Sequence, residues 1–328
     1  MEIGRVKETI KKRAILKKIE HCYQKESSSD IITVSDTATV PVWLLEEERS
    51  DYIKVQIEAV FNQLSILSAK PMMMTVFIML PEQTEEICLR FLMDCLVEIA
   101  KKKQIKISDV KAECSPDVIN TVLFLTIFGR KESESLPFYN VKAFLPGKEL
   151  VMVGTAALEG TIMLENAGRT ILEQRFSRRF LERVRSLSSK MELENKLEVI
   201  KTRKDIGIYY IGRTGVFGAL WEIASITKKG FLIERKEIPI YQETIELCEF
   251  FDVNPYMLRS GSAWILALNQ GRTFVEKCKS CGIEAAIIGT MESNADKLVC
   301  NGEDCCYLTM PTAVKLKQHQ PKGLQFIY

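Results

Sequence analysis

The stretch from Gly207 to Ala267 constrains the fold most, because it strings together a loop, two helices and two strands without ambiguity. Its loop is Tyr209–Gly215, and the apolar residues after it recur at helical spacing as far as Ile226. Gly230 stands where the C-cap glycine of that helix belongs. The remaining predicted elements are a short strand at 231–233, a turn at 238–240, a helix at 243–251 and a buried strand at 263–268.

The loop before the first of these helices is a candidate anion site. Unpaired backbone N–H groups and the helix dipole both point toward the residues that precede a helix. Arg213 and Thr214 complete no standard phosphate-binding motif, so the loop alone is a weak predictor of phosphate.

The first part of the chain predicts a β-α-β-α-β pattern of its own. Its clearest element is the apolar run Met72–Leu80, which lies between two prolines and is typical of a strand buried on both faces. A helix follows, with Thr84 as its predicted N-cap and with acidic residues in its first turn and lysines in its last. The other predicted elements are strands at 31–34, 105–107 and 121–128 and a helix at 52–67.

A polar, charged segment at 131–137 is the predicted domain boundary, which divides the chain into domains 1–137 and 138–328. The second domain should begin with a strand at 150–154. It should then pass through the turn Ala157–Thr161 into a helix. Further predicted elements are an amphipathic helix at 176–191, a helix that ends at Cys281, a strand at 285–289 and a hairpin around Asn301-Gly302.

The charge balance gives no reason to expect a nucleic-acid partner. The chain has 45 basic and 43 acidic residues among 328, a formal charge of +2, so no global field favours a polyanion. Residues 1–21 form a predicted basic helix, but no aromatic side chains are interleaved with its lysines and arginines. No run is long enough for a membrane span, and the first 20 residues lack the apolar core of a signal peptide. We therefore expect a cytoplasmic protein that binds neither nucleic acid nor a membrane.

The ten cysteines are expected to be reduced thiols, most of them buried. Cys278 and Cys281, with Cys300, Cys305 and Cys306 downstream, could supply four thiolates to zinc. Against that, the first two fall in a predicted helix and no glycine-containing knuckle frames either pair. We predict no metal site.

The second domain resembles the C-terminal half of the aminoimidazole ribonucleotide synthetase (AIR synthase, PurM-like) superfamily. The resemblance rests on the run GVFGALWE at 215–222, on IPI at 238–240, on Glu243-Thr244, Cys248-Glu249 and Asn254-Pro255, and on SGS at 260–262. Within the superfamily, the chain is most similar to the hydrogenase maturation factor HypE and to AIR synthase-related proteins. The resemblance extends from Glu2 to about Leu308, and it is specific in the second domain and weak in the first.

The resemblance implies a two-domain α/β architecture of the α+β type. The N-terminal domain would pair with its copy across a dimer axis to complete a shared β-barrel, and the C-terminal domain would be an α/β sandwich beside it. Family enzymes use Mg-ATP to phosphorylate an amide or acid oxygen, a reaction that depends on positioning and metal charge. The positions that match the family's nucleotide site are Asp36, Asn62, Glu113, Gly160, Thr161, Arg213 and Gly215.

The family's ATP motifs are damaged at four places in this chain. The glycine-rich loop expected before Asp36 is missing, and Gln63 replaces the aspartate of an Asn-Asp pair. Segment 109–112 lacks two glycines, and only Gly215 survives of the loop motif before the helix. Mg²⁺ requires anionic oxygen ligands beside the phosphates, so the neutral amide of Gln63 is a poor substitute. HypE proteins also end in a reactive cysteine, whereas residues 307–328 contain none.

Two hypotheses about function remain. The preferred one is a non-catalytic homodimer that acts as a scaffold or binds an anion or small molecule between its domains, with an intact relative as a further candidate partner. The alternative is an ATP-dependent enzyme in which Asp36 and Glu113 are substitute ligands. The first hypothesis predicts that these two acids lie far apart or in salt bridges, and the second that both face one open cleft.

Overall fold

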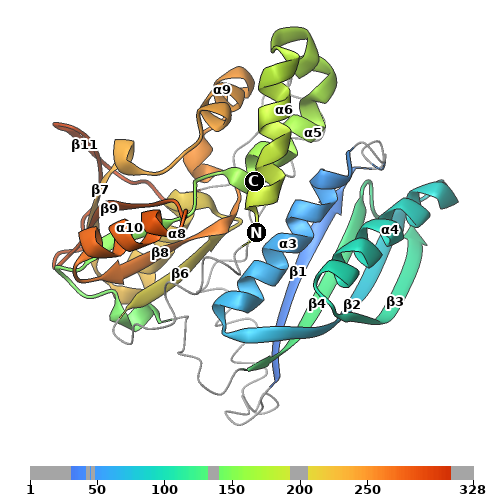
Figure 1. Cartoon of the computed structure of the whole chain (residues 1–328), viewed down its shortest axis with the longest axis horizontal. Coiled ribbons are helices and arrows are strands. Elements are labelled where there is room, and N and C mark those ends of the chain that lie inside the picture. The colour runs from blue at the N-terminus through green and yellow to red at the C-terminus, as the bar shows by residue number, and fades with distance from the viewer. Residues whose placement is uncertain (1–30, 42–44, 46–48, 132–139, 193–205, 312–328) are drawn as a thin grey trace.

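The computed structural model describes residues 31–41, 45, 49–131, 140–192 and 206–311, which form two β-sheets with helices packed against them (Figure 1). The elements built around the first sheet are β1 Ile31–Val40, α3 Ser50–Ile66, β2 Ala69–Pro81, α4 Glu86–Lys102, β3 Lys106–Ser115 and β4 Thr121–Lys131. The strands of the second sheet are β5 Glu149–Val153, β6 Gly207–Gly212, β7 Gly230–Glu234, β8 Ser260–Leu268, β9 Ala285–Glu292, β10 Lys297–Asn301 and β11 Asp304–Tyr307. The α-helices that follow β5 are α5 Leu158–Arg175, α6 Arg178–Ser186, α8 Gly215–Thr227, α9 Gln242–Phe251 and α10 Gly271–Ser280.

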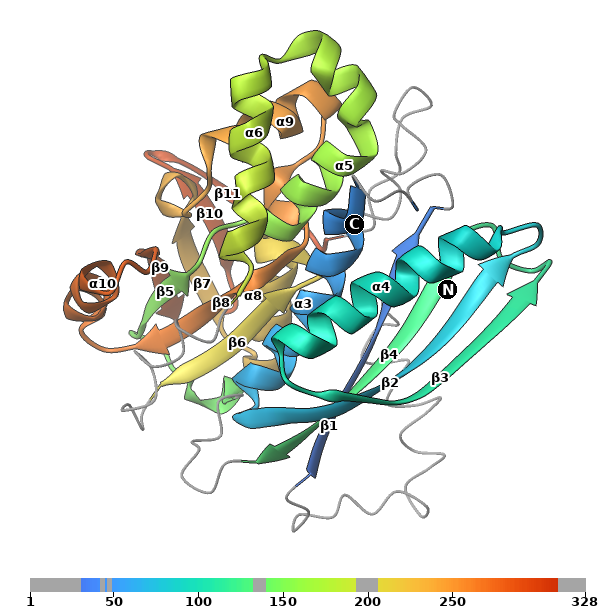
Figure 2. The same cartoon turned by 45° about the vertical axis from the view of Figure 1, so that its right-hand side comes forward.

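The first sheet has the strand order β1-β4-β2-β3, and helices α3 and α4 lie on one of its faces (Figure 2). Side chains of β2 alternate accordingly, because Met74, Val76 and Ile78 are buried under the helices whereas Phe77 is only half-buried on the other face. The prediction that this strand is buried on both faces is therefore wrong. No described helix or strand covers the second face.

The second sheet has the order β11-β10-β7-β9-β5-β8-β6 and is covered on both faces in its centre. Helix α8 packs on one face, and Phe274 and Cys278 of α10 pack on the other. Every residue of β8 is consequently buried. The long apolar run of this strand, unlike that of β2, confirms the predicted fully buried strand.

Helix α3 lies between the first sheet and the elements of the second sheet, where it contacts β8, α5 and β6 as well as its own sheet. This position explains why polar residues on several sides of the helix are buried, among them Gln56 and Asn62. A helix that is covered on two sides must satisfy these polar groups internally. The hydrogen bonds that do so define the junction between the two sheets.

Four local predictions are corrected. The predicted loop 209–215 is mostly strand β6, because Tyr209 and Ile211 alternate into the core, and only Arg213 and Thr214 form the turn. Gly230 begins β7, and Lys228 is the left-handed C-cap of α8 instead.

The other two corrections concern the first sheet. Glu85 is the N-cap residue of α4, while the Thr84 hydroxyl donates to the Pro81 carbonyl. The polar segment 108–114 continues a strand predicted to end at Ile107, because pairing with β2 supplies its backbone hydrogen bonds and overrides its low strand propensity.

Several predictions fall outside the described residues. They are the basic helix at 1–21, residues 132–137 of the boundary, and the part of the tail beyond residue 311. The domain limits 1–137 and 138–328 therefore stay predictions.

Candidate functional site

The junction between the two sheets is organised around the carbonyl group of Gly261 on β8. The Asn62 Nδ2 atom donates to the Gly261 oxygen and to the Met191 oxygen, both at 2.8 Å. The Tyr210 hydroxyl lies 3.0 Å from the same Gly261 oxygen and 2.9 Å from the Ala59 oxygen of α3. Burial raises the pKa of Tyr210 well above its ordinary value, so the phenol stays neutral and can donate. These contacts tie α3 to β6 and β8.

Asp36 and Arg213 form an ion pair at the solvent-accessible end of this junction. The Arg213 Nη2 atom lies 2.9 Å from Asp36 Oδ1, and Nη1 donates to the Thr37 hydroxyl at 3.0 Å. Side-chain exposure is 36% for Arg213 and 29% for Asp36, so solvent reaches both groups. Burial lowers the pKa of Arg213, but a guanidinium stays charged at neutral pH. We call Asp36 and Arg213 the outer pair.

Deeper in the junction, Glu159 of α5 and Arg259 form a second pair that we call the inner pair. The Arg259 Nη1 atom lies 3.2 Å from Glu159 Oε1, and their side chains are only 6% and 1% exposed. Arg259 Nη1 also donates to Gln56 Oε1 at 3.4 Å, while Gln56 Nε2 donates to the backbone carbonyl oxygen of Tyr52 at 3.0 Å. The inner pair thereby connects α5 to α3.

The inner pair is not fully satisfied. Glu159 Oε2, Arg259 Nε and the Tyr52 hydroxyl are buried and have no hydrogen-bond partner among the described residues. Burial raises the pKa of the Glu159 carboxyl, and the neighbouring Arg259 offsets only part of that rise. The two pairs together place two guanidinium groups against two carboxylates, so the junction is close to electrically neutral when all four are ionised.

The predicted site residues Gly160, Thr161 and Gly215 serve packing. A Cβ atom on Gly160 would lie 2.9 Å from the Leu258 Cβ atom, and one on Gly215 would lie 2.5 Å from the Tyr256 oxygen. The Thr161 hydroxyl, fully buried, lies 2.8 Å from both the Ala157 oxygen and the Thr244 hydroxyl. These contacts fix how α5 and α8 approach the segment before β8.

Glu113 lies apart from the other predicted site residues. It is exposed on β3, one edge of the first sheet, whereas Asp36 is on β1, the opposite edge. Its register partner is Met79 of β2. Asp36 is in a salt bridge, and the two acids do not face one cleft. The structure thus brings together Asp36, Asn62 and Arg213 of the predicted set and leaves Glu113 out.

Sequence reasoning missed four residues of the junction, namely Gln56, Glu159, Tyr210 and Arg259. Glu159 and Arg259 were the more accessible to prediction, since charged residues next to apolar or glycine-rich runs are costly to bury unless they are paired. Nothing in the sequence indicated that residues 100 positions apart form that pair.

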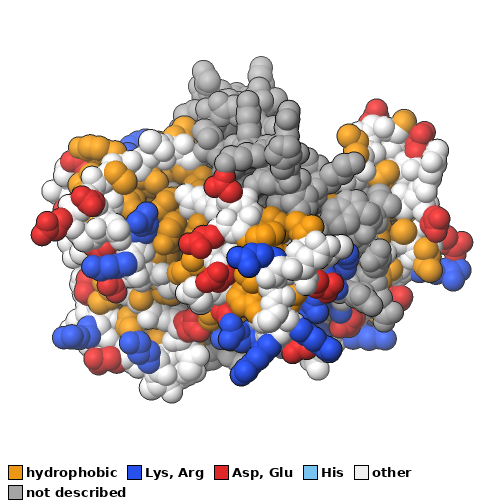
Figure 3. Space-filling model, turned by 90° about the horizontal axis from the view of Figure 1, so that it is seen from above, with side chains coloured by type: hydrophobic (Ala, Val, Ile, Leu, Met, Phe, Trp, Pro, Cys, Tyr) orange, Lys and Arg blue, Asp and Glu red, His pale blue; other side chains and the backbone are white. Residues whose placement is uncertain are grey.

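The surface offers two open hollows away from this junction. One, of ≈ 490 Å³, is lined by Arg235 and by residues of the β10–β11 hairpin, and the other, of ≈ 630 Å³, lies between 236–240 and 279–286. On the face shown in Figure 3, lysine and arginine side chains lie among aspartates and glutamates, as the formal charge of +2 leads us to expect.

The described residues include neither a cluster suited to a metal ion nor a helix suited to a membrane. No three His, Cys, Asp or Glu side chains there are grouped so that they could hold a metal ion. Within the same residues, none of the helices combines the length and apolarity that crossing a membrane requires.

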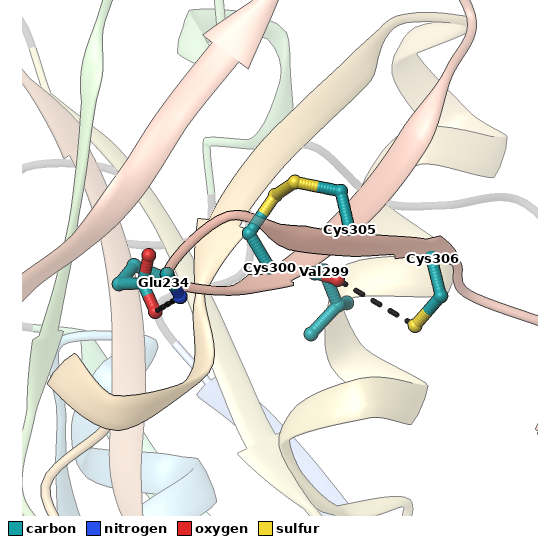
Figure 4. Close-up of a disulfide and its surroundings, with 6 residues drawn as sticks. Glu234, Val299, Cys300, Cys305 and Cys306 are labelled. Atoms are coloured by element: carbon teal, nitrogen blue, oxygen red, sulfur yellow. Dashed lines mark hydrogen bonds between the residues drawn. A yellow bond between two sulfur atoms is a disulfide. The ribbon is translucent and has the colours of Figure 1, made fainter.

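One pair of cysteines contradicts the expectation of reduced thiols throughout. Cys300 and Cys305 form a disulfide across β10 and β11 (Figure 4). The strand register places them directly opposite each other, and the described cysteines with free thiols include Cys88, Cys95, Cys114, Cys248, Cys281 and Cys306.

Comparison with known proteins shows the fold. The chain matches the crystal structure of E. coli HypE with a TM-score of 0.69 and 15% identity, over 99% of this chain and 93% of that one. It matches HypE in complex with ATP with a TM-score of 0.65 and 16% identity, over 98% and 97%. Thiamine monophosphate kinase from Aquifex aeolicus matches with a TM-score of 0.62 and 15% identity, over 89% and 96%. The chain therefore has the two-domain fold of the PurM-like superfamily. No protein-family model and no curated protein matches the sequence.

Proposed function

We propose that this chain is a catalytically degraded, homodimeric protein of the PurM-like fold that acts as a scaffold or anion-binding protein. The observation that carries the proposal is the use made of the positions that match the family's nucleotide site. Asp36 is held by Arg213, and Asn62 is bound to two backbone carbonyls. Side chains that join the two sheets in this way are not free to ligate the metal ion of a magnesium–nucleotide complex.

The same positions do not fit magnesium. Mg²⁺ needs carboxylate oxygens in near-octahedral geometry next to the phosphates. Asp36 is the one carboxylate of the predicted set at the junction, and it already neutralises a guanidinium. Glu113 is on the opposite edge of the sheet, so it cannot be a second ligand beside Asp36. Losing even one group that stabilises a transition state commonly costs about 100-fold in rate.

The outer pair is the part of the junction suited to an anion. Arg213 is 36% exposed and presents a guanidinium that can bind a phosphate or carboxylate through two parallel hydrogen bonds. Asp36 competes for that guanidinium, so the proposed anion binding is weak and independent of magnesium.

The alternative function is an ATP-dependent enzyme that phosphorylates an amide or acid oxygen with substituted ligands. One observation favours it: the chain shares its fold with HypE in complex with ATP and with thiamine monophosphate kinase. Under this alternative, Arg213 would bind the phosphates in place of a metal, and Asp36 would turn away from it.

Isothermal titration calorimetry distinguishes the two functions. The protein is titrated with ATP in the presence of Mg²⁺ and again with Mg²⁺ removed by EDTA. We expect weak binding of equal strength in both titrations, lost in Arg213→Gln. Binding that tightens at least about tenfold with Mg²⁺, or ATP hydrolysis that stops in Asp36→Asn, would establish the alternative instead.

The proposed homodimer uses the uncovered face of the first sheet. Phe77 and Phe124 stack there with their ring centroids 5.8 Å apart, and the Phe124 side chain is 42% exposed. Half-buried apolar side chains extend this face on β2 and β4, namely Met73, Met79, Val122 and Phe128. A sheet that faced only water on this side would carry polar side chains at these positions.

Light scattering tests the dimer. Phe124→Asp would bring a charge into the proposed interface, so we expect it to convert a dimer of the full chain into a monomer at micromolar concentration. Ile87→Asp is the matched control, since Ile87 is 68% exposed on α4 and should leave the dimer intact. A wild-type monomer at the same concentration would rule out the homodimer, and an intact relative of the same fold would then be the partner to test.

The proposal places the protein in a reducing, cytoplasm-like compartment. Three described cysteines with free thiols, Cys114, Cys281 and Cys306, are exposed. Exposed thiols persist where thiols are kept reduced.

A further inference from the structure

The Cys300–Cys305 disulfide lies in a hairpin at the edge of the second sheet. Among the strands that the structure describes, β11 pairs only with β10, and all four of its residues are exposed. The two cysteines are five positions apart and directly opposite in the strand register. The bond therefore closes a small loop that the backbone ladder already closes, and it adds little to the constraint on the fold.

The two cysteine residues differ in accessibility. Cys305 is exposed, whereas Cys300 is buried with 3% of its surface accessible. Both line the open hollow of ≈ 490 Å³, together with Cys306, Arg235, Glu303 and Asp304. An incoming thiol can thus approach the bond from solvent and reach Cys305 first, and the lining, with charges of both signs, does not exclude a neutral thiol.

The other cysteines of the protein provide the contrast. Cys306 directly follows Cys305, but it points to the opposite side of the strand, where its Sγ atom lies 3.5 Å from the Val299 oxygen (Figure 4). Burial raises the pKa of the Cys95 thiol to about 11 and that of Cys248 to about 12, so these thiols are poor nucleophiles at neutral pH. A disulfide among so many free thiols is of the kind that is usually exchanged rather than permanent.

We propose that the Cys300–Cys305 pair is a thiol–disulfide exchange site whose substrates are dithiols that enter the hollow beside Arg235. A thiolate of the dithiol attacks Cys305 Sγ, the S–S bond breaks, and its electron pair leaves on Cys300 Sγ, which takes up a proton. The second thiolate of the dithiol then attacks the dithiol sulfur bound to Cys305 and releases the Cys305 thiolate. The protein disulfide is reduced to two thiols, and the dithiol is oxidised to a disulfide.

Exchange at this site also changes how β11 is held. In the oxidised protein, β11 is joined to β10 both covalently and through its ladder. After reduction the ladder remains, together with the hydrogen bond from the Leu308 nitrogen to the Lys297 oxygen at 2.7 Å and the contact between Cys306 Sγ and the Val299 oxygen. The edge strand of the second sheet is then free to fray, whereas the interior of the sheet is unaffected.

Alkylation with mass spectrometry tests the site in the full chain, with dithiothreitol as the probe. We expect dithiothreitol to make Cys300 and Cys305 reactive to iodoacetamide as a pair, at concentrations that leave the circular dichroism spectrum unchanged. Cys95 and Cys248 should stay unlabelled. The proposal is wrong if the pair becomes labelled only after unfolding in urea, or if both cysteines are already labelled in protein alkylated during purification without any reductant.

Three single variants locate the reacting sulfur. Cys306→Ser should undergo thiol–disulfide exchange at the wild-type rate, because the Cys306 thiol lies on the other side of the strand. A rate about tenfold lower would show that Cys306 takes part in the exchange. The variant Cys300→Ser keeps the exposed Cys305 thiol, and the variant Cys305→Ser keeps the buried Cys300 thiol. The Cys305 thiol in the first variant should be alkylated at least about tenfold faster than the Cys300 thiol in the second. The reverse order would overturn attack at Cys305.

Hydrogen exchange tests the consequence for β11. We expect reduction, or the Cys305→Ser substitution, to speed exchange at the amides of residues 304–307 by about tenfold without changing β5 or β8. Unchanged exchange at 304–307 would show that the disulfide does not control this strand.

Discussion

The inner and outer ion pairs lie in the same junction and consist of the same two chemical groups, yet they differ in burial. Glu159 and Arg259 are 1% and 6% exposed, whereas Asp36 and Arg213 are 29% and 36% exposed. A buried pair must compensate for the loss of hydration at both charges, so removing one partner is costly. A half-exposed pair contributes little to stability and remains available to a ligand. The inner pair therefore maintains the architecture, and the outer pair is where the proposed anion binding would take place.

The strongest test of this difference is Arg259→Met. The substitution leaves the buried Glu159 carboxylate without its ion-pair partner and removes the donor to Gln56, so we expect a loss of about 3–5 kcal/mol in the free energy of unfolding. Urea denaturation of the full chain measures it. The double variant Arg259→Met/Glu159→Gln removes both charges and should recover much of the loss. A single-variant loss below about 1 kcal/mol would show that the inner pair does not maintain the junction.

A second test uses pH. Burial raises the pKa of Glu159 above its ordinary value of 4.5 in the folded protein. The stability that this carboxyl contributes is therefore fully present below the unfolded pKa and is lost as the pH rises through the folded pKa. We expect wild-type stability to fall relative to Glu159→Gln as the pH increases above 4.5.

The measurement is the unfolding free energy of both proteins from about pH 4 to pH 8, by denaturant titration at each pH. Asp117→Asn, which removes an exposed acid from the turn between β3 and β4, is the control for a general change of charge. The opposite result is that the wild type becomes more stable relative to Glu159→Gln as the pH rises. It would mean that the attraction of Arg259 for the Glu159 carboxylate outweighs the cost of burying that carboxylate.

The architecture could be predicted from sequence because it depends on periodicity. The fully apolar run of β8 indicated a strand covered on both sides, and the structure confirms it. The similar apolar run of β2 could not show whether one or both faces of its sheet are covered. Phe77 and Met79 are apolar, although no described element covers them. Periodicity reports which residues are apolar and does not report what covers them.

Pairwise contacts were less predictable. Asn301-Gly302 correctly indicated a turn, but the turn residues are Gly302 and Glu303, one position further on. This one-residue shift places Cys300 opposite Cys305 and creates the disulfide that the sequence did not indicate. In the junction, Asp36 and Arg213 were both candidates, but nothing local showed that they meet across 177 positions of chain.

The smallest expected effect on stability, and the most informative about binding, comes from Asp36→Asn. The outer pair is partly hydrated, so losing its charge–charge attraction should change the unfolding free energy by less than about 1 kcal/mol. Arg213 would keep its hydrogen bond to Thr37 but lose its competing carboxylate, so affinity for inorganic phosphate should rise by about tenfold in calorimetry. Asp117→Asn, an equal charge change at an exposed turn far from the junction, should leave phosphate affinity unchanged. Equal affinities in all three proteins would mean that Asp36 does not mask an anion site, and the outer pair would then be structural like the inner one.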